Sequence, residues 1–269
     1  MTGSSCPALF DADRVVVVAG NGPSLARLTP GRVLASDAVV RTNNFFFEPE
    51  CYLGLRVDLA VMSGDPRVAP FMFETLWRHG RDYDIGAWTG RNPRVVAAGR
   101  RRFARQFRPF AYRDAHVERM VEQICARYGR KPTTGTLAVI AAHGAGARRI
   151  VMAGFDLHSG ARRYIYAPGR NYRALMAASL SQPGPEPHLH DPSLDIEILT
   201  ALAARDDLSL GVACESSVLR AHLPAAPVRS GPAFQRQLRQ APADWVGRVG
   251  AYPISMLRLF RRLRSVTRA

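Results

Sequence analysis

The chain has 269 residues, 47% of them hydrophobic and 22% charged, a composition that excludes a disordered or fibrous protein. The length suits one large α/β domain with an appendage. The formal net charge of +15 favours an anionic partner, and more than half of it lies in residues 228–269, which hold nine Arg and one Asp. Because Lys131 is the only lysine, a GC-rich genome explains the arginine excess as well as function does.

The cysteines and the apolar runs bear on where the protein works. Four cysteines, Cys6, Cys51, Cys125 and Cys214, are far apart and show no paired spacing, so we expect reduced thiols in a cytoplasmic protein. The N-terminus lacks the basic and apolar segments of an export signal. No apolar run reaches the ~18–20 residues that a membrane-spanning helix needs. We therefore expect any membrane contact to be peripheral, on the inner face of the cytoplasmic membrane.

Short apolar runs alternate with helical patterns along the chain. Residues 14–20 (RVVVVAG) are a β-branched run without polar alternation, which is typical of a parallel strand buried on both faces. The alternation predicts an α/β fold with a doubly wound, mostly parallel, Rossmann-like sheet, whose ligands bind beyond the carboxyl ends of the strands. Further strands are predicted at 36–43, 57–62, 149–153 and 208–212, and helices at 116–128, 135–143 and 193–204.

Residues 157–192 interrupt this alternation. They are rich in Gly, Pro, Ser and Tyr, and a stretch of that length inside a compact domain is usually a functional lid or a disordered insertion. We predict a small lid here, as part of a main domain of residues 1–227 that carries the functional site.

The remaining residues, 228–269, are predicted to form a basic tail. Apolar and basic side chains separate there onto two faces of a helix, a pattern typical of an interfacial helix on an anionic membrane. We predict such contact through residues 245–264, with a solvated tail as the alternative. A second arginine run, Arg100, Arg101, Arg102, Arg105 and Arg108, is predicted to be a solvated helix face. The apolar face of the tail comprises Met256, Leu257, Phe260 and Leu263, and the basic face Arg258, Arg261, Arg262 and Arg264.

Three short motifs carry the candidate chemistry. AGNGPSL at 19–25 follows the first predicted strand, where its glycines allow a tight turn and its amides favour an anion, although such turns are often only structural. RTNNFFFE at 41–48 offers paired amides that suit a nucleoside or a carboxylate, or else a capped turn over an aromatic core. RKPTTG at 130–135 places two hydroxyls at a helix start beside two cations, which suits a carboxylate or a simple N-cap.

Taken in order, these motifs resemble those of the bacterial Cst-like sialyltransferases, glycosyltransferase family 42. The resemblance runs from about residue 14 to 224 and includes AGFDL at 153–157, His190 five residues before DIE, and CESSVLRAHLP at 214–224. It implies a GT-A-like variant fold and an inverting, membrane-associated enzyme that transfers sialic acid from CMP-sialic acid to a glycan hydroxyl. It also implies lipooligosaccharide or capsule synthesis, a glycan or glycolipid acceptor, and a homo-oligomer, a tetramer.

The resemblance assigns roles to individual residues. His190 corresponds to the proposed general base, and an imidazole with a pKa near ~6.5 is largely free as a base at neutral pH. Tyr164 corresponds to a lid tyrosine that binds the phosphate and assists its departure, with Tyr166 as the alternative. The donor-binding residues implied are Asn21, Gly22 and Ser24 near the phosphate and ribose, Asn43 near the cytidine and sugar, Thr133, Thr134 and Gly135 at the carboxylate, and Gly154, Phe155 and Asp156 along the nucleotide.

Two positions depart from the family pattern. His158 stands where the family has its first lid tyrosine, and an imidazole can still donate a hydrogen bond to phosphate. Lys131 stands where the family has an arginine, with Arg130 one residue before it. Because a lysine is a point charge and an arginine a planar fork, this exchange is not neutral if the contact is bidentate.

We expect no cofactor and no metal ion. Asp11 and Asp13 spell the Asp-x-Asp motif of metal-dependent transferases, but they precede the first predicted strand. A CMP donor carries a single phosphate charge, which hydroxyl and amide donors are able to neutralise.

Three alternatives stay open at this point. A donor such as CMP-Kdo or another CMP-activated acid fits the same motifs. A nucleic-acid-binding protein is favoured by the charge but shows no known reader motif, so we expect no nucleic-acid partner. A third reading is a relative that binds a nucleotide but has lost catalysis through the changes at His158 and Lys131.

Overall fold

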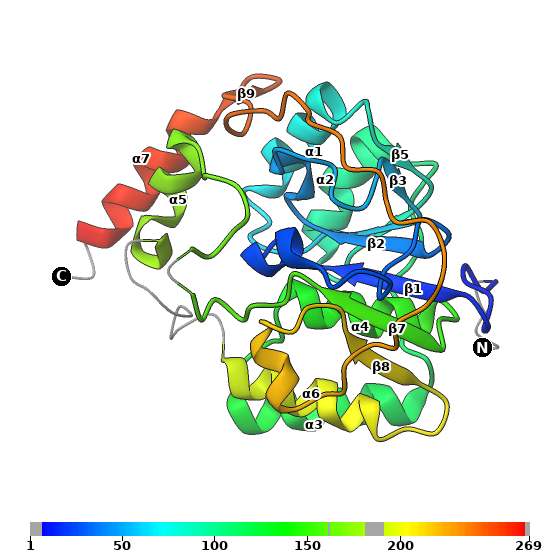
Figure 1. Cartoon of the computed structure of the whole chain (residues 1–269). Coiled ribbons are helices and arrows are strands. Elements are labelled where there is room, and N and C mark those ends of the chain that lie inside the picture. The colour runs from blue at the N-terminus through cyan, green and yellow to red at the C-terminus, as the bar shows by residue number, and fades with distance from the viewer. Residues whose placement is uncertain (1–6, 161, 181–190, 267–269) are drawn as a thin grey trace.

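The computed structural model of the protein describes residues 7–160, 162–180 and 191–266. Six strands form one sheet in the order β6-β4-β2-β1-β7-β8, and all neighbouring pairs are parallel. Figure 1 shows this sheet between two layers of other elements. The predicted α/β fold with a mostly parallel sheet is confirmed. The strands are β1 (Val15–Ala19), β2 (Ala38–Thr42), β4 (Leu59–Val61), β6 (Trp88–Thr89), β7 (Arg149–Ala153) and β8 (Ser209–Val212).

Strand β1 is central and buried on both faces. Val16 and Val18 pack into one hydrophobic cluster, while Val17 and Ala19 pack into another on the opposite face. All five residues of the strand are buried, which explains why its sequence shows no polar alternation. The predicted strand at 57–62 is interrupted at Asp58, whose carboxylate accepts a hydrogen bond from the Val39 amide at 2.7 Å.

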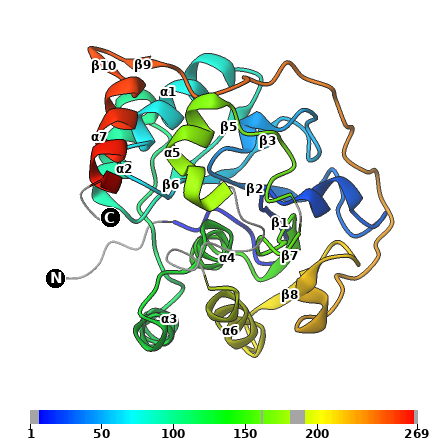
Figure 2. The same ribbon diagram turned by 90° about the vertical axis from the view of Figure 1, so that its left-hand side faces the viewer.

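Helices α3, α4 and α6 cover one face of the sheet (Figure 2). The other face is covered by the loop around η1 and, toward β6, by α1 and α2. Two of these helices, α1 and α2, fall in a stretch where no element except the arginine-bearing face was predicted. The bounds are α1 (Ala69–His79), α2 (Pro93–Phe103), α3 (Ala115–Tyr128), α4 (Thr134–Gly144), α6 (Pro192–Ala203), η1 (Pro23–Arg27), η2 (Phe45–Phe47) and η3 (Val218–Ala221).

The arginine run at 100–108 is not a purely solvated face. Arg102 Nε donates to Glu74 Oε2 at 2.7 Å, and Glu74 is only 2% exposed. Arg78 donates to the other oxygen of the same carboxylate at 2.8 Å. These bonds hold the pKa of Glu74 below its ordinary value, against the opposing effect of burial. Arg102 therefore joins α2 to α1, because a buried carboxylate needs a cation beside it.

The lid segment contains a helix, α5 (Arg170–Leu180). The carboxylate of Asp244 accepts hydrogen bonds from the amide of Tyr172, at 3.1 Å, and from that of Asn171. The lid is thus tied to the C-terminal part of the chain.

Two further small sheets pair β3 (Arg56–Val57) with β5 (Asp84–Ile85) and β9 (Arg248–Val249) with β10 (Tyr252–Pro253).

We predicted that the C-terminal residues form a separate tail, but the structure shows that they pack against the main domain. Residues 228–247 cross the main domain as an extended segment (Figure 1). Arg229 pairs with buried Asp37 at 2.7 Å, and Arg239 donates to the carbonyl of His79 at 3.0 Å. Trp245 is 5% exposed. The arginines of this segment therefore serve partly as internal contacts, and the boundary at 227/228 does not separate two units.

The last helix, α7 (Ile254–Val266), packs beside α5 in both views (Figures 1 and 2). Ile254 and Leu257 are buried in the core, at 3% and 2% exposed. The predicted apolar face is therefore wrong in part, because Leu257 points inward. The exposed apolar side chains of α7 are Met256, Leu259, Phe260 and Leu263. None of the helices in the described part of the chain is long and apolar enough to cross a membrane.

Candidate functional site

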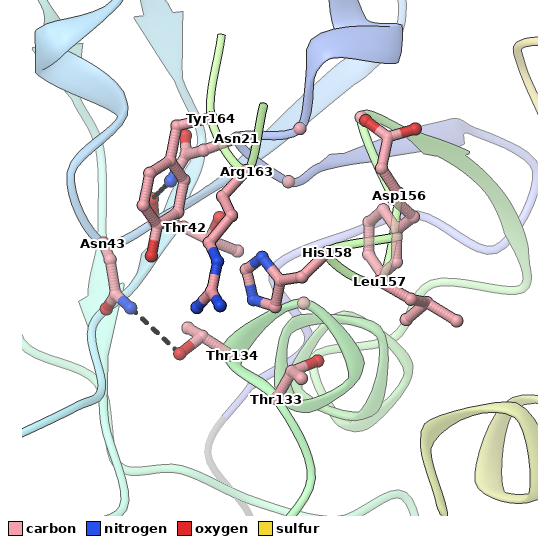
Figure 3. Close-up of a pocket in the computed structure, with 15 residues that line it drawn as sticks. Asn21, Thr42, Asn43, Thr133, Thr134, Asp156, Leu157, His158, Arg163 and Tyr164 are labelled. Atoms are coloured by element: carbon pink, nitrogen blue, oxygen red, sulfur yellow. Dashed lines mark hydrogen bonds between the residues drawn. The ribbon is translucent and has the colours of Figure 1, made fainter. Parts of the chain in front are cut away.

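A pocket lies at the carboxyl ends of β1, β2 and β7, beside the N-terminus of α4 (Figure 3). The chain runs from β1 to β2 on one side and returns to β7 on the other, so the pocket occupies the point where the strand order reverses. Open parallel sheets bind their ligands at such points. The lining residues are Gly20, Asn21, Gly22, Thr42, Asn43, Thr133, Thr134, Gly135, Gly154, Phe155, Asp156, Leu157, His158, Arg163 and Tyr164.

Two glycines allow the loops after β1 and β7 to meet. Gly154 has a φ of +66°, and a Cβ at Gly20 would lie 2.5 Å from the carbonyl oxygen of Gly154. A larger residue at Gly20 would therefore push the two loops apart. The amide of Gly22 also donates to the carbonyl of Gly154 at 3.0 Å. This close contact fixes the floor of the pocket.

Asn21 holds the loop after β1 against the end of β2. Its Nδ2 donates to the carbonyl of Thr42 at 2.9 Å, and its backbone carbonyl accepts from the Ile165 amide at 2.9 Å. Its Oδ1 is buried and has no hydrogen-bond partner among the described residues. An unpaired buried acceptor costs about 1–3 kcal/mol.

Asn43 connects three elements of the pocket. Its Oδ1 accepts from the Ser63 amide at 2.7 Å, and its Nδ2 donates to Thr134 Oγ1 at 2.9 Å, the contact drawn in Figure 3. These bonds join the ends of β2 and β4 to the start of α4. Asn43 itself has a φ of +43°, a conformation that asparagine tolerates better than most residues.

The rest of the RTNNFFFE motif is structural. Phe45, Phe46 and Phe47 are all buried. Arg41 and Glu48 form an ion pair in which each side chain is 1% exposed. The Tyr83 hydroxyl donates to the same glutamate at 2.8 Å. The aromatic-core interpretation of this motif therefore holds for the residues after Asn43, whereas Asn43 lines the pocket and its amide bonds to Ser63 and Thr134.

Thr133 caps α4 and is held by a buried carboxyl group. Its hydroxyl oxygen accepts from the Thr136 amide at 3.4 Å, and its own amide and hydroxyl donate to Asp195 Oδ1 at 2.9 and 3.1 Å. Asp195 is 1% exposed. Burial raises its pKa to about 6, although the hydrogen bonds from Thr133 oppose the shift. The first turn of α6 is in this way fixed to the edge of the pocket.

The lid side of the pocket is built from the segment after β7. Leu157 and His158 have φ values of +46° and +60°, and two consecutive non-glycine residues in the left-handed region are costly and gather at functional sites. The His158 ring meets Tyr164 edge to face at 5.8 Å, and Tyr164 stacks on Tyr166 at 5.2 Å. Both His158 and Tyr164 line the pocket, as the sequence predicts.

Several predicted site residues lie elsewhere. Ser24 is fully buried and outside the lining; its amide donates to Asp156 Oδ2 at 2.9 Å. We predicted that an anionic ligand binds at the start of η1, but the carboxylate of Asp156 occupies that position. Tyr166 is also in the core, and burial raises its pKa well above the ordinary value. Of the two tyrosines assigned to the phosphate, Tyr164 therefore lines the pocket and Tyr166 does not.

The predicted cations do not line the pocket. Lys131 is exposed, and neither it nor Arg130 belongs to the lining.

Asp11 and Asp13 are exposed before β1 and also lie outside the lining of the pocket. His190 falls outside the described residues.

Sequence reasoning missed three lining residues, Thr42, Leu157 and Arg163. Thr42 ends β2, and Leu157 follows the AGFD residues, so both are neighbours of predicted positions. Arg163 adjoins Tyr164 but stands in a run of two arginines that reads as ordinary surface charge. Residues 7–160, 162–180 and 191–266 contain no group of three or more His, Cys, Asp or Glu that would hold a metal ion.

Known structures share this architecture. Sialyltransferase CstII from Campylobacter jejuni, in a complex with the substrate analogue CMP-3FNeuAc, has a TM-score of 0.74 at 20% identity, covering 88% of this chain and 96% of that one. The chain has the fold of this sialyltransferase. The α-2,3-sialyltransferase Cst-I of the same organism has a TM-score of 0.71 at 19% identity and covers 95% of both chains. No protein-family model and no curated protein sequence matches the chain.

Proposed function

We propose that the protein is a sialyltransferase that takes sialic acid from CMP-sialic acid. The observation that carries this proposal is the bond between Asn43 and Thr134, two residues 91 positions apart that the sequence motifs assign to one donor site. They meet in the pocket at the strand reversal, together with Asn21, His158 and Tyr164. The likeness to a CstII complex with CMP-3FNeuAc supports the same choice of donor.

The pocket offers neutral hydrogen-bond donors and acceptors for the nucleotide. Asn21, with its unpaired Oδ1 at the loop after β1, is assigned to the ribose and phosphate region. Asn43, at the end of β2, is assigned to the cytidine and sugar. Gly154 and Phe155 at the end of β7 line the same space. Preorganised groups of this kind stabilise developing charge because they need no rearrangement during the reaction.

The leaving phosphate is assigned to the lid. Tyr164 and His158 line the pocket and contact each other, so a phenol and an imidazole lie where each would donate a hydrogen bond to a departing CMP. As the bond to the sugar breaks, negative charge grows on the phosphate oxygens, and these donors bind it more strongly than they bind the ground state. Because CMP carries one phosphate, the reaction is proposed to need no metal ion or other cofactor.

His190 is proposed as the base that removes the proton from the acceptor hydroxyl, with inversion at the sugar. This assignment rests on its position five residues before DIE in the sequence. It is supported by the bond between Asp195, in the first turn of α6, and Thr133 at the pocket. General-base catalysis of this kind contributes ~10²–10⁴-fold to a rate.

The acceptor is proposed to be a glycan or glycolipid in lipooligosaccharide or capsule synthesis at the inner face of the cytoplasmic membrane. The exposed apolar side chains of α7 belong to a helix whose sequence also carries arginines, which suits peripheral contact with an anionic bilayer. A homo-oligomer, a tetramer, is proposed from the family resemblance alone. CMP-Kdo is the alternative donor. Binding of nucleic acid is less favoured, because Arg229 and Arg239 make internal contacts.

The test is turnover of CMP-Neu5Ac in the presence of EDTA, followed by release of CMP. We expect activity in wild type, a loss of about 10²–10⁴-fold in His190→Ala, and little change in the nearby control His188→Ala. Equal rates in wild type and His190→Ala would remove the base assignment. Turnover of CMP-Kdo but not CMP-Neu5Ac would favour the alternative donor, and no turnover of any CMP-sugar would overturn the proposed function.

A further inference from the structure

The charge of the pocket does not come from the residues that the sequence motifs indicate. Arg130 and Lys131 lie outside the lining, and Asp156 is engaged with the Ser24 amide. Within the described residues, Arg163 is the lining side chain that carries a permanent positive charge. A CMP-linked sugar acid brings two negative charges, a phosphate and a carboxylate. Such anions bind tightly to a partly buried site when a cation supplies charge-assisted hydrogen bonds.

The chain directly after Arg163 is held in place. Two residues later, the Ile165 amide donates to the carbonyl of Asn21 at 2.9 Å, and the next residue, Tyr164, stacks on Tyr166. Arg163 is half-buried. Figure 3 shows its guanidinium pointing into the pocket, toward the side where Thr133 and Thr134 begin α4.

The start of α4 is suited to an anion from the opposite direction. Asn43 Nδ2 donates to Thr134 Oγ1 at 2.9 Å, so the oxygen of that hydroxyl is already an acceptor and its hydrogen is left to donate. The helix has 11 residues, and the N-terminus of a helix favours a negative charge. A carboxylate between Thr134 and Arg163 would thus receive an O–H from one side and N–H groups from the other.

We propose that Arg163 binds the carboxylate of the transferred sugar acid, opposite Thr134, and makes the site specific for acidic sugars. This inference rests on the proposed function and deepens it. An arginine fork matches a carboxylate with two parallel hydrogen bonds, which a lysine does not. Arg163 supplies this fork from the lid, whereas the sequence motifs place the cation before Thr133. His158 and Tyr164 remain for the phosphate.

The experiment compares binding of CMP with binding of CMP-3FNeuAc, which carries the carboxylate that CMP lacks, by titration calorimetry. The variants are Arg163→Gln and Arg163→Lys, with Arg162→Gln as the control, because Arg162 is exposed and outside the lining. We expect Arg163→Gln to weaken CMP-3FNeuAc by about 10–100-fold and CMP by less than about threefold, since the lost bonds are charge-assisted. Arg163→Lys should lie between, and Arg162→Gln should match wild type.

Each outcome separates this inference from the proposed function. An equal loss of affinity for CMP and CMP-3FNeuAc in Arg163→Gln would assign Arg163 to the phosphate and overturn the carboxylate contact. Unchanged affinity for both ligands in a folded Arg163→Gln variant would remove Arg163 from donor binding altogether. If wild type binds neither ligand, the proposed function itself fails.

Discussion

The two rims of the pocket are built in different ways. On the sheet side, Asn21 and Asn43 follow buried strands and are fixed by bonds to Thr42, Ser63 and Thr134. The lid side is a single segment after β7, and contacts between aromatic side chains hold it in place. Each sheet-side residue can therefore be traced to a short motif, whereas the position of the lid depends on residues distant in the sequence.

Trp245 connects the two rims. Its indole Nε1 donates to Asn44 Oδ1 at 3.0 Å, beside the site residue Asn43, and its ring stacks on Tyr172 at 4.3 Å. Tyr172 in turn meets Tyr164 at 5.8 Å. The C-terminal segment thus holds the lid tyrosine against the sheet side, although it contributes nothing to the pocket lining itself.

The largest effect that we predict is loss of this connection. Trp245→Ala should lower the free energy of unfolding by about 3–5 kcal/mol, because it removes a large buried side chain. Trp245→Phe keeps most of the stacking and should cost about 1–3 kcal/mol through the unpaired Asn44. Denaturant unfolding measures both. Trp77→Ala is the control, since Trp77 is 39% exposed; a loss no larger than that of Trp77→Ala would contradict the role given to Trp245.

The second prediction concerns the carboxyl group that supports the sheet side. The pKa of Asp195 rises from an unfolded value of 3.8 to about 6 in the folded protein, so the folded state binds more protons between these values. Stability due to this group is therefore present at low pH and falls by about 3 kcal/mol as the pH rises from 4 through 6. Asp195→Asn should remove this part of the pH dependence in unfolding experiments.

Asp206→Asn, at an exposed position on the loop after α6, is the matched control and should follow wild type. If Asp195→Asn and wild type show parallel pH profiles, Asp195 does not titrate as an isolated buried carboxyl group, and the support that it gives to Thr133 needs another account.

The third prediction separates the side chain of Asn43 from its backbone. Asn43→Ala should reduce stability by about 1–3 kcal/mol, because the Ser63 amide loses its acceptor. Affinity for CMP should fall by about 10-fold or more, because a lost contact worth about 1.4 kcal/mol changes affinity tenfold. Asn43→Gly suits the φ of +43° and should recover about 1 kcal/mol of stability but none of the affinity. Recovery of CMP binding in Asn43→Gly would show that the amide is not a ligand contact.

The smallest effect is expected on the surface of α7. Phe260→Asp should change the free energy of unfolding by less than about 0.5 kcal/mol, since Phe260 is 52% exposed. Binding to vesicles that contain anionic lipids should nevertheless decrease. Leu238→Asp, at a position 85% exposed on the crossing segment, is the control. Equal vesicle binding by wild type and both variants would refute membrane contact through this helix.

The contrast between the rims also explains what sequence reasoning reached. The buried run Val15–Ala19 and the glycines after it follow from local physical rules, so the sheet and the residues at its strand ends were predictable. The internal role of Trp245 was not, because it depends on Asn44 and Tyr172 far along the chain. Residues 228–269 were predicted to form a separate tail for the same reason. Their composition shows their charge, whereas the ion pair between Arg229 and Asp37 depends on the fold.

Ser24 and Arg163 show the same limit within the site. The turn at Ser24 has the composition of an anion site, yet the anion that fills it is Asp156 from the loop after β7. In the sequence Arg163 resembles an ordinary surface arginine, and only the position of the lid in the structure shows that it lines the pocket.

A crystal structure of the protein with CMP tests the central claim most directly. We predict cytidine next to Asn43, ribose or phosphate within hydrogen-bonding distance of Asn21, and the phosphate beside His158 and Tyr164. CMP bound elsewhere on the molecule, or an empty pocket at saturating CMP, would contradict the assignment of this pocket as the donor site.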